Sequence, residues 1–333
     1  MFKVTVNPKG YEIDVLENET VFEALQRQGY TVAFGCKNGV CELCEAQLIA
    51  GKIYHKANTE VTANDHAETI LVCVAKPQSD LIIELQNIFA PGELPLHTVA
   101  CQIRSVQAFN ESIYKVQLLL PAGKQVKYLS GQYLEVVLPS GEACAYSIAS
   151  APQDGRHLEL HIRHNRNEET SNHVIKHFQN EPMVNIRLPM GDCFLSELPN
   201  GPIILVATTT GFSQIQSLLK NLFAKTFKHP IHFYWGARHP SDLYLHDQTL
   251  EWANQYQNFH YTPVLRETLP HGWKGSIGSL HDAILQDFAD LSDTTIYTSG
   301  TPDMVYTTLD ALVEKGLKQE QMKSDVFAYA PRS

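Results

Sequence analysis

The alternation of apolar and polar residues changes character along the chain. Residues 2–6 alternate in the manner of a half-buried strand. Thr20 and Glu23 form a capping box, which predicts a short helix that begins at Thr20 and ends before Gly29. Between residues 98 and 199, short alternating stretches such as 133–138 and 158–162 are separated by turn residues, which is typical of an antiparallel barrel or sandwich.

From residue 200 onward, the pattern predicts alternating strands and helices. Residues 203–207 form a continuous apolar run, as in a strand buried on both faces. Further strands are expected at 231–235 and 295–298, and a helix is expected to begin near Pro302. The helix after the first strand has apolar residues at helical spacing, at Ile215, Leu218, Leu219, Leu222 and Phe223. This region therefore predicts an α/β doubly wound domain with a parallel sheet, whose ligands bind at the strand C-terminal ends.

These patterns predict a multidomain chain. We expect domains at residues 1–90, 98–199 and 200–333, with a linker at 91–97. The linker contains Pro91, Gly92 and Pro95, which can continue neither a helix nor a strand ladder.

Composition and charge exclude several classes of function. The 333 residues carry 26 Lys and Arg against 36 Asp and Glu, a formal charge of −10 without a basic block, so neither nucleic acid nor an anionic membrane is an expected partner. Residues 1–90 alone contain 7 basic and 12 acidic residues, a charge of −5. No apolar run reaches the roughly 18 residues of a membrane span, and the N-terminus lacks a signal-peptide pattern. The expectation is a cytoplasmic protein with no membrane insertion.

Four of the seven cysteines are clustered with a specific spacing. Cys36, Cys41 and Cys44 follow a C-x4-C-x2-C pattern in a glycine-containing loop, and Cys73 follows after 28 intervening residues. This spacing resembles that of plant-type [2Fe–2S] ferredoxins, and the resemblance implies an α+β ferredoxin domain of the β-grasp type, with these four cysteines as metal ligands. The alternative is zinc, which usually takes two paired C-x2–4-C units and fits this spacing poorly. Of the remaining cysteines, Cys101 and Cys193 are expected to be buried apolar residues.

The middle region contains flavin-type motifs. Gly131-Gln132-Tyr133, the run 144–150, His161-Ile162-Arg163 and the helix start at 170–175 together resemble the antiparallel β-barrel flavin domain of the ferredoxin–NAD(P)H reductase superfamily. The resemblance implies FAD or FMN, held by Tyr146, Ser147, Ile148, His161, Arg163 and Ser171. Two positions depart from the family pattern. Cys144 stands where the family has an arginine, and Asn167-Glu168-Glu169 replaces the expected glycine.

The last third resembles the nicotinamide domain of the same superfamily. Thr208-Thr209-Thr210-Gly211 stands in place of a Gly-Gly-Thr-Gly loop, and Ser299-Gly300-Thr301-Pro302 matches a Cys-Gly-x-Pro segment. The run 325–329 resembles a terminal strand that can place an aromatic ring over the flavin. The resemblance implies a nucleotide site that includes Thr209, Thr210, Gly211 and Gly300, and catalytic roles for Tyr146, Ser147, Ser299 and Tyr329. Arg238 follows a strand and could contact a ribose phosphate, but such arginines are common, so the sequence favours NADH over NADPH only weakly.

The order of the three modules resembles CDP-6-deoxyglucoseen reductase and the reductase components of oxygenases. It implies an NAD(P)H-dependent iron–sulfur flavoprotein reductase. Such an enzyme moves electrons through flavin to the [2Fe–2S] cluster and on to a partner protein, an oxygenase or a dehydratase. Two alternatives stay open: a free-flavin reductase with an attached ferredoxin, and a non-catalytic [2Fe–2S] electron carrier with degenerate nucleotide sites.

Overall fold

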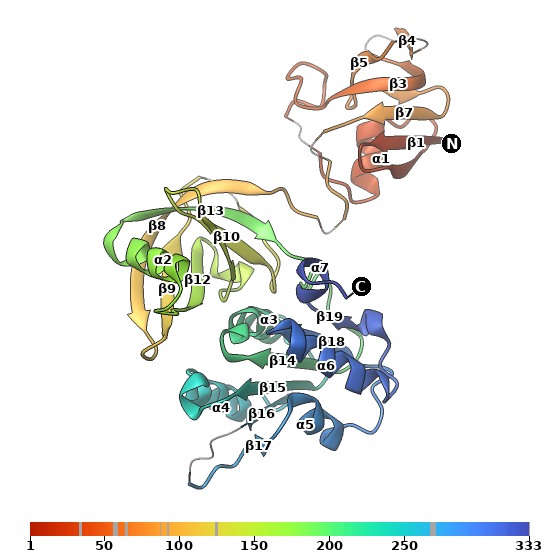
Figure 1. Ribbon diagram of the computed structural model, residues 1–333. Coiled ribbons are helices and arrows are strands. Elements are labelled where there is room, and N and C mark those ends of the chain that lie inside the picture. The colour runs from red at the N-terminus through yellow and green to blue at the C-terminus, as the bar shows by residue number, and fades with distance from the viewer. Residues whose placement is uncertain are drawn as a thin grey trace. The chain divides into compact units, whose positions relative to one another are not determined.

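The computed structural model describes residues 1–32, 35–55, 59–63, 66–86, 88–91, 93–123, 126–266 and 271–332. The chain separates into two compact units, Met1–Pro95 and Leu96–Ser333 (Figure 1). Gly92, which belongs to the expected linker, lies outside the described residues. No helix in these ranges is long and apolar enough to cross a membrane.

The first unit is a mixed sheet with one described helix against it. The strands pair in the order β2-β1-β7-β3-β4, with β5 and β6 also paired to β3, and β1 runs parallel to β7. Helix α1 begins after Thr20, whose hydroxyl accepts from the Glu23 amide, so the predicted capping box is confirmed. The elements are β1 (Phe2–Asn7), β2 (Tyr11–Val15), α1 (Val21–Arg27), β3 (Glu45–Tyr54), β4 (Glu60–Ala63), β5 (Glu68–Leu71), β6 (Lys76–Pro77) and β7 (Leu81–Glu84).

The second unit begins with an antiparallel sheet in the order β11-β10-β13-β8-β9-β12. A bridge between Ile148 and Leu160 links the two edges of this sheet, so that it forms a nearly closed barrel, as the sequence predicted. The buried face of α2 packs against the barrel core through Val174, Ile175 and Phe178. The elements are β8 (His97–Ala108), β9 (Ile113–Leu119), β10 (Tyr133–Val137), β11 (Ala143–Ser147), β12 (His157–Arg163), α2 (Glu169–Asn180) and β13 (Met183–Met190).

The rest of this unit is a parallel sheet in the order β17-β16-β15-β14-β18-β19. Leu205 and Ala207 of β14 pack with α3 on one face, and Ile204 and Val206 pack with α5 and α6 on the other. The sheet is therefore doubly wound, as predicted. The elements are β14 (Ile203–Thr208), α3 (Phe212–Ala224), β15 (Ile231–Ala237), α4 (His246–Gln255), β16 (Phe259–Leu265), β17 (Ser276–Ile277), α5 (Leu280–Asp287), β18 (Thr295–Ser299), α6 (Pro302–Val313), β19 (Met322–Lys323) and α7 (Val326–Tyr329).

The C-terminal segment corrects one expectation. Residues 325–329 were expected to form a terminal strand, but Val326–Tyr329 is the short helix α7. The chain turns here because the Asp325 carboxylate accepts hydrogen bonds from the amides of Asp192 and Cys193, both at 3.0 Å, and the Tyr329 amide bonds to the Asp325 carbonyl. Asp325 is thus fixed against the segment after β13, a contact that no local sequence pattern reveals.

Candidate functional site

The cysteine loop is arranged to hold thiolates. The Cys36 sulfur accepts hydrogen bonds from the amides of Val40 (3.2 Å) and Cys41 (3.3 Å), and the Cys36 amide donates to the Cys41 sulfur (3.4 Å). Amides of Asn38, Val40 and Cys41 lower the pKa of Cys36 to about 6. A loop whose backbone donors point at a sulfur stabilises the charged ligand form.

Cys44 and Cys73 form a second, buried pair. Burial, together with the hydrogen bond and charge of Cys44, raises the pKa of Cys73 to about 11, and the charge of Cys36 also acts on Cys73. All seven cysteines are free of disulfide bonds. Within the described ranges, no three Cys, His, Asp or Glu side chains enclose a single ion. Two neighbouring pairs of thiols fit a binuclear iron cluster, which takes two protein ligands at each iron, better than one tetrahedral zinc ion.

A cavity of about 620 Å³ lies between the barrel and the C-terminal ends of β14 and β18. That position is where open parallel sheets bind ligands. Ten of the residues predicted from the sequence line it: Tyr146, Ser147, His161, Arg163, Thr209, Thr210, Gly211, Ser299, Gly300 and Tyr329. The cavity therefore brings four of the six expected flavin residues and the expected nicotinamide residues to one place.

Two predicted flavin residues lie outside the cavity lining. Ile148 is fully buried in the barrel core, where it pairs with Leu160. The Ser171 hydroxyl accepts from the Asn165 amide at 2.9 Å and donates to the Arg163 carbonyl at 3.5 Å, so it fixes the turn before α2. The roles of both residues toward a flavin stay predictions.

The walls of the cavity fit a flavin ring. Tyr133 and Tyr146 supply aromatic surface, and burial raises the pKa of Tyr146, which keeps its phenol neutral. The buried Thr298 hydroxyl also lines the cavity, and it has no hydrogen-bond partner among the described residues. A ring with polar edges would satisfy such a group, since buried polar atoms are normally hydrogen-bonded. The donor set and the volume therefore fit an isoalloxazine.

Thr209 keeps the backbone geometry that a glycine would normally supply. Its φ is +44°, in the left-handed region that a β-branched residue rarely adopts. The Trp235 indole donates to the Thr209 carbonyl at 3.0 Å and holds this turn. The chain therefore retains a tight turn at the end of β14 although threonines replace the family's glycines, and backbone strain of this kind is typical of ligand sites.

A buried polar network lies beside the cavity and joins the barrel to the parallel-sheet region. Glu159 of β12 accepts from Gln216 of α3 at 2.8 Å and from His161 Nε2 at 3.0 Å, and the Tyr244 hydroxyl is 2.9 Å from His161 Nδ1. Burial would raise the pKa of Glu159, but the hydrogen bonds from His161 and Gln216 outweigh it and lower the pKa to about 2. Because this carboxylate only accepts, His161 donates from Nε2, and Tyr244 donates to Nδ1.

We expect Glu159→Gln to remove part of the acid sensitivity of the second unit. A lowered folded-state pKa gives stability that is present above the ordinary Glu value of 4.5 and lost as the pH falls toward about 2. The ionised Glu159 carboxylate contributes at most about 3 kcal/mol to the free energy of unfolding at neutral pH. Trp235, Trp252 and Trp273, the only tryptophans, all lie in this unit, so urea unfolding followed by tryptophan fluorescence at pH 6 and pH 3.5 measures it alone.

The exposed Glu181 provides the matched control, because it caps α2 without a buried partner. Glu181→Gln should leave the loss of unfolding free energy between the two pH values unchanged. An equal loss in the wild-type protein and in Glu159→Gln would contradict the role assigned to this carboxylate.

A second group of buried polar contacts, around Gln214, was not predicted from the sequence. Gln214, in the first turn of α3, donates to the Gly131 carbonyl at 2.6 Å and to the Asp325 carboxylate at 2.8 Å. Burial raises the pKa of Asp325, and both residues line the cavity. The available signal was the run of polar residues 213, 214, 216 and 217 at the start of an otherwise apolar helix, all of which are buried.

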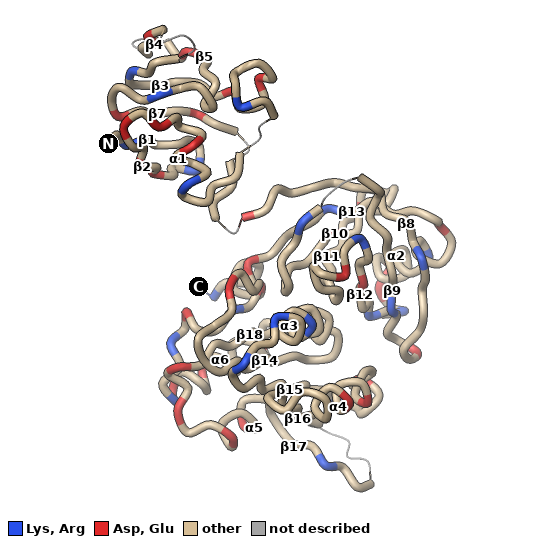
Figure 2. Tube along the Cα trace, turned by 180° about the vertical axis from the view of Figure 1, so that it is seen from behind, with Lys and Arg blue, Asp and Glu red and all other residues tan. Residues whose placement is uncertain are grey.

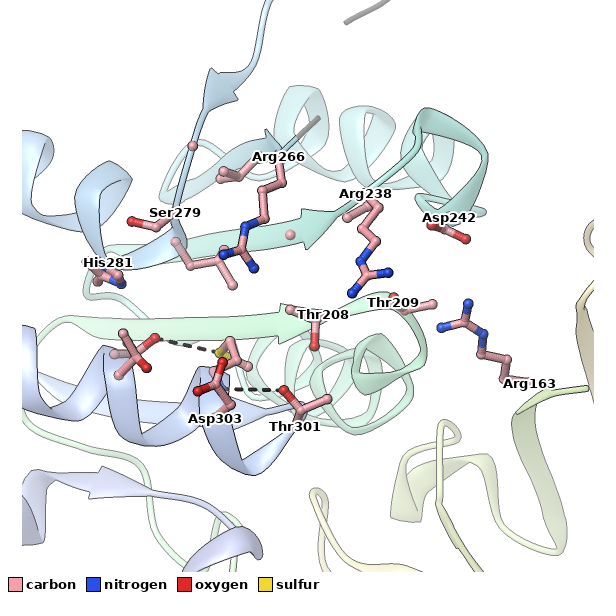
Figure 3. Close-up of a pocket in the computed structure, with 18 residues that line it drawn as sticks. Arg163, Thr208, Thr209, Arg238, Asp242, Arg266, Ser279, His281, Thr301 and Asp303 are labelled. Carbon is pink, nitrogen blue, oxygen red and sulfur yellow. Dashed lines mark hydrogen bonds between the residues drawn. The ribbon is translucent and has the colours of Figure 1, made fainter. Parts of the chain in front are cut away.

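A second cavity of about 340 Å³ opens at the ends of β14, β15 and β16 (Figure 3). Arg238 and Arg266 each stand directly after their strand, and Arg163 reaches the same space from the barrel. Thr209 and Arg163 line both cavities, so the two are adjacent. One extended ligand can therefore place one end in each, as a dinucleotide requires.

Three family models match successive parts of the chain. A 2Fe-2S iron-sulfur cluster binding domain matches residues 4–78, an oxidoreductase FAD-binding domain matches 100–194, and an oxidoreductase NAD-binding domain matches 205–310. Their order is the order of the ferredoxin-like sheet, the barrel and the doubly wound sheet.

Whole proteins with the same arrangement are similar over nearly the full length. The CDP-6-deoxy-L-threo-D-glycero-4-hexulose-3-dehydrase reductase of Yersinia pestis is 30% identical over 97% of this chain and 98% of its own. Reductase component 1 of the terephthalate 1,2-dioxygenase of a Comamonas species is 27% identical over 94% of this chain and 93% of its own. A probable flavin reductase of Photobacterium leiognathi is 36% identical over 69% of this chain and 98% of its own.

Proposed function

Because the chain belongs to the iron–sulfur flavoprotein reductases, which join a [2Fe–2S] domain to FAD-binding and NAD-binding domains, we propose specific roles for its residues in electron transfer. The protein is an oxidoreductase that acts on NAD(P)H and moves electrons through a flavin to a [2Fe–2S] cluster. The flavin accepts two electrons together and releases them one at a time, and this chemistry belongs to the cofactor. The residues bind, orient and shield it.

The shared cavity supports the assignment of the hydride-transfer site. Tyr146 and Ser147 line it from the barrel, and Ser299 and Gly300 line it from the end of β18. In the proposal, Tyr146 packs against the flavin ring, Ser147 bonds its polar edge, and Ser299 borders the path from the nicotinamide. Tyr329, whose side chain is largely exposed at the end of α7, covers the other side of the ring.

The phosphate end of the flavin site differs from the family pattern. Cys144 occupies the arginine position, and Glu142 on the adjacent turn accepts from Thr170 and His173, both at 3.1 Å. Arg163 is the cationic residue on the barrel side of the cavity. We assign to Arg163 the charge that balances a flavin phosphate, because guanidinium groups bind phosphate oxygens in pairs.

The cluster is held by Cys36, Cys41, Cys44 and Cys73 in the proposal. The two neighbouring thiol pairs and the amides directed at Cys36 support it. Electrons leave through a protein acceptor, and an oxygenase or dehydratase component is proposed because relatives carry those names. Acidic residues recur along the strands of the first unit (Figure 2), so an acceptor with a basic docking surface is favoured. A cytoplasmic location is proposed, since free thiols and the cluster need a reducing compartment.

An anaerobic titration of the purified protein with NADH and then NADPH tests this function. The expected result is bleaching of a flavin spectrum, followed by the loss of cluster absorbance and the appearance of an electron paramagnetic resonance signal. The function is wrong if neither nucleotide reduces any chromophore, and a cluster reduced only by an added reductase would instead identify a non-catalytic carrier.

A free-flavin reductase with an attached ferredoxin is the second candidate. The altered phosphate end at Cys144 and Glu142 favours it, as does the similarity of 69% of the chain to nearly the whole of a probable flavin reductase. Dialysis separates the two: flavin lost on dialysis, with NAD(P)H oxidation restored in proportion to added flavin, would support this candidate.

A further inference from the structure

The second cavity carries the chemistry of phosphate recognition. It lies at the C-terminal ends of three neighbouring parallel strands, with Arg238 after β15 and Arg266 after β16 (Figure 3). Both side chains are exposed at its rim, so they are open to a ligand. Neither has an ion pair with a carboxylate in the described part of the chain. Two free guanidinium groups on adjacent strands form a site for a dianion.

The position of Arg238 decides which part of a nucleotide meets these groups. In dinucleotide-binding sheets, the residue after the second strand faces the adenosine ribose: an acidic residue accepts from the 2′-hydroxyl in NAD sites, and an arginine accommodates the 2′-phosphate in NADP sites. Here β14 is the first strand of the domain, β15 is the second, and Arg238 directly follows it. A carboxylate that would repel a 2′-phosphate is therefore absent from this position.

The rest of the cavity wall agrees with a phosphorylated ribose. Ser279 and His281, at the start of α5, line the side next to Arg266, and the helix N-terminus adds a favourable field for an anion. The Ser279 hydroxyl itself is used, since it caps the Asp282 amide at 3.2 Å. Two carboxylates, Asp242 and Asp303, also line the cavity. Arg163 is assigned to the flavin phosphate, so Arg238 and Arg266 are the two cations that face a nucleotide phosphate here, and the two carboxylates can accept from ribose hydroxyls.

We propose that this cavity binds the 2′-phosphate of NADPH, and that Arg238 and Arg266 select NADPH over NADH. The inference rests on the proposed function, in which the nicotinamide end of the same molecule reaches Ser299 in the adjacent cavity. The proposal reverses the weak preference for NADH that the sequence gives. Arg266 is distant from Arg238 in the sequence, and only the pairing of β15 with β16 brings the two arginines to the same cavity.

Calorimetric binding of 2′,5′-ADP and of 5′-AMP to the full-length holoprotein tests the proposal without turnover, since the two probes differ only in the 2′-phosphate. We expect 2′,5′-ADP to bind at least about tenfold more tightly. Arg238→Met and Arg266→Met should each weaken the binding of 2′,5′-ADP by roughly tenfold to a hundredfold, which is the usual effect of losing a charged hydrogen-bonding partner. Neither substitution should change the affinity for 5′-AMP. The kcat/KM ratio of NADPH to NADH should fall by the same factors.

Arg104→Met is the matched control, because Arg104 lies on β8 and contacts Gln102 away from the cavity. This substitution should change the binding affinity of neither 2′,5′-ADP nor 5′-AMP. Equal binding of the two probes, or a preference that survives both cavity variants, would overturn the proposal. If NADH then reduces the flavin and the cluster, the electron-transfer function stands without it; if neither nucleotide does, the proposed function itself fails.

Discussion

Replacing Cys73 with alanine is expected to abolish the [2Fe–2S] cluster while NAD(P)H still reduces the flavin. Cys73 is buried and paired with Cys44, so its loss removes one of the two thiolates proposed for one iron. Loss of an outer-shell partner alone costs roughly 10–100-fold in metal affinity, so loss of a ligand should lower the iron and labile sulfide content by at least about tenfold. Electron transfer to a one-electron protein acceptor should fall with them.

The control for this variant is Cys101→Ala. Cys101 is fully buried in β8 of the second unit, so it matches the change in side chain and in burial without touching the cluster loop. The control should retain its iron and its cluster spectrum. A Cys73→Ala protein with a full iron content and an unchanged spectrum would show that the cluster has another ligand set, and zinc in the wild-type protein would overturn the cluster assignment altogether.

Adding one methyl group at Gly211 is expected to slow flavin reduction strongly. A Cβ at this position would overlap with the backbone carbonyl oxygen of Ser299, so the ends of β14 and β18 would have to move apart. Overpacking of this kind costs roughly 1–3 kcal/mol of unfolding free energy. A displacement of about 1 Å at a reacting centre can cost on the order of a hundredfold in rate, and Ser299 borders the proposed hydride path.

Stopped-flow reduction of the flavin by NADPH measures this effect, and urea unfolding measures the stability of the same protein. Gly141→Ala is the control: its Cβ would meet nothing within 4 Å in the turn after β10, although its φ of +90° also makes alanine unfavourable there. The control should lose about 1–2 kcal/mol of unfolding free energy and keep its rate of flavin reduction. Normal reduction in Gly211→Ala would remove Ser299 from the hydride path.

Most of the fold follows from local patterns in the sequence. The apolar run at 203–207 became β14, the apolar spacing from Ile215 to Phe223 became the buried face of α3, and the capping box at Thr20 begins α1. Patterns of this kind suffice because strand and helix periodicity reflect burial directly. The prediction of a strand at 325–329 was wrong, since the helix there depends on contacts between Asp325 and residues more than 100 positions earlier.

The candidate site was less accessible from the sequence. The residues of recognisable motifs do gather around one cavity, but Gln214, Glu159 and Arg266 carry no motif. Their importance comes from partners on other strands: a glutamate is ordinary on a barrel surface and becomes a buried acceptor only when Gln216 and His161 meet it. Tertiary contacts of this kind cannot be read from spacing.

The chain folds into two self-contained units, and both are made as parts of one polypeptide. Each unit has its own hydrophobic core, and a single covalent connection near Pro95 and Leu96 joins them. A covalent connection raises the effective concentration of one unit for the other, up to the millimolar range for short linkers. Synthesis as one polypeptide therefore guarantees one electron carrier for each dehydrogenating module, without matched expression of two genes, and leaves only the final acceptor to be met by diffusion.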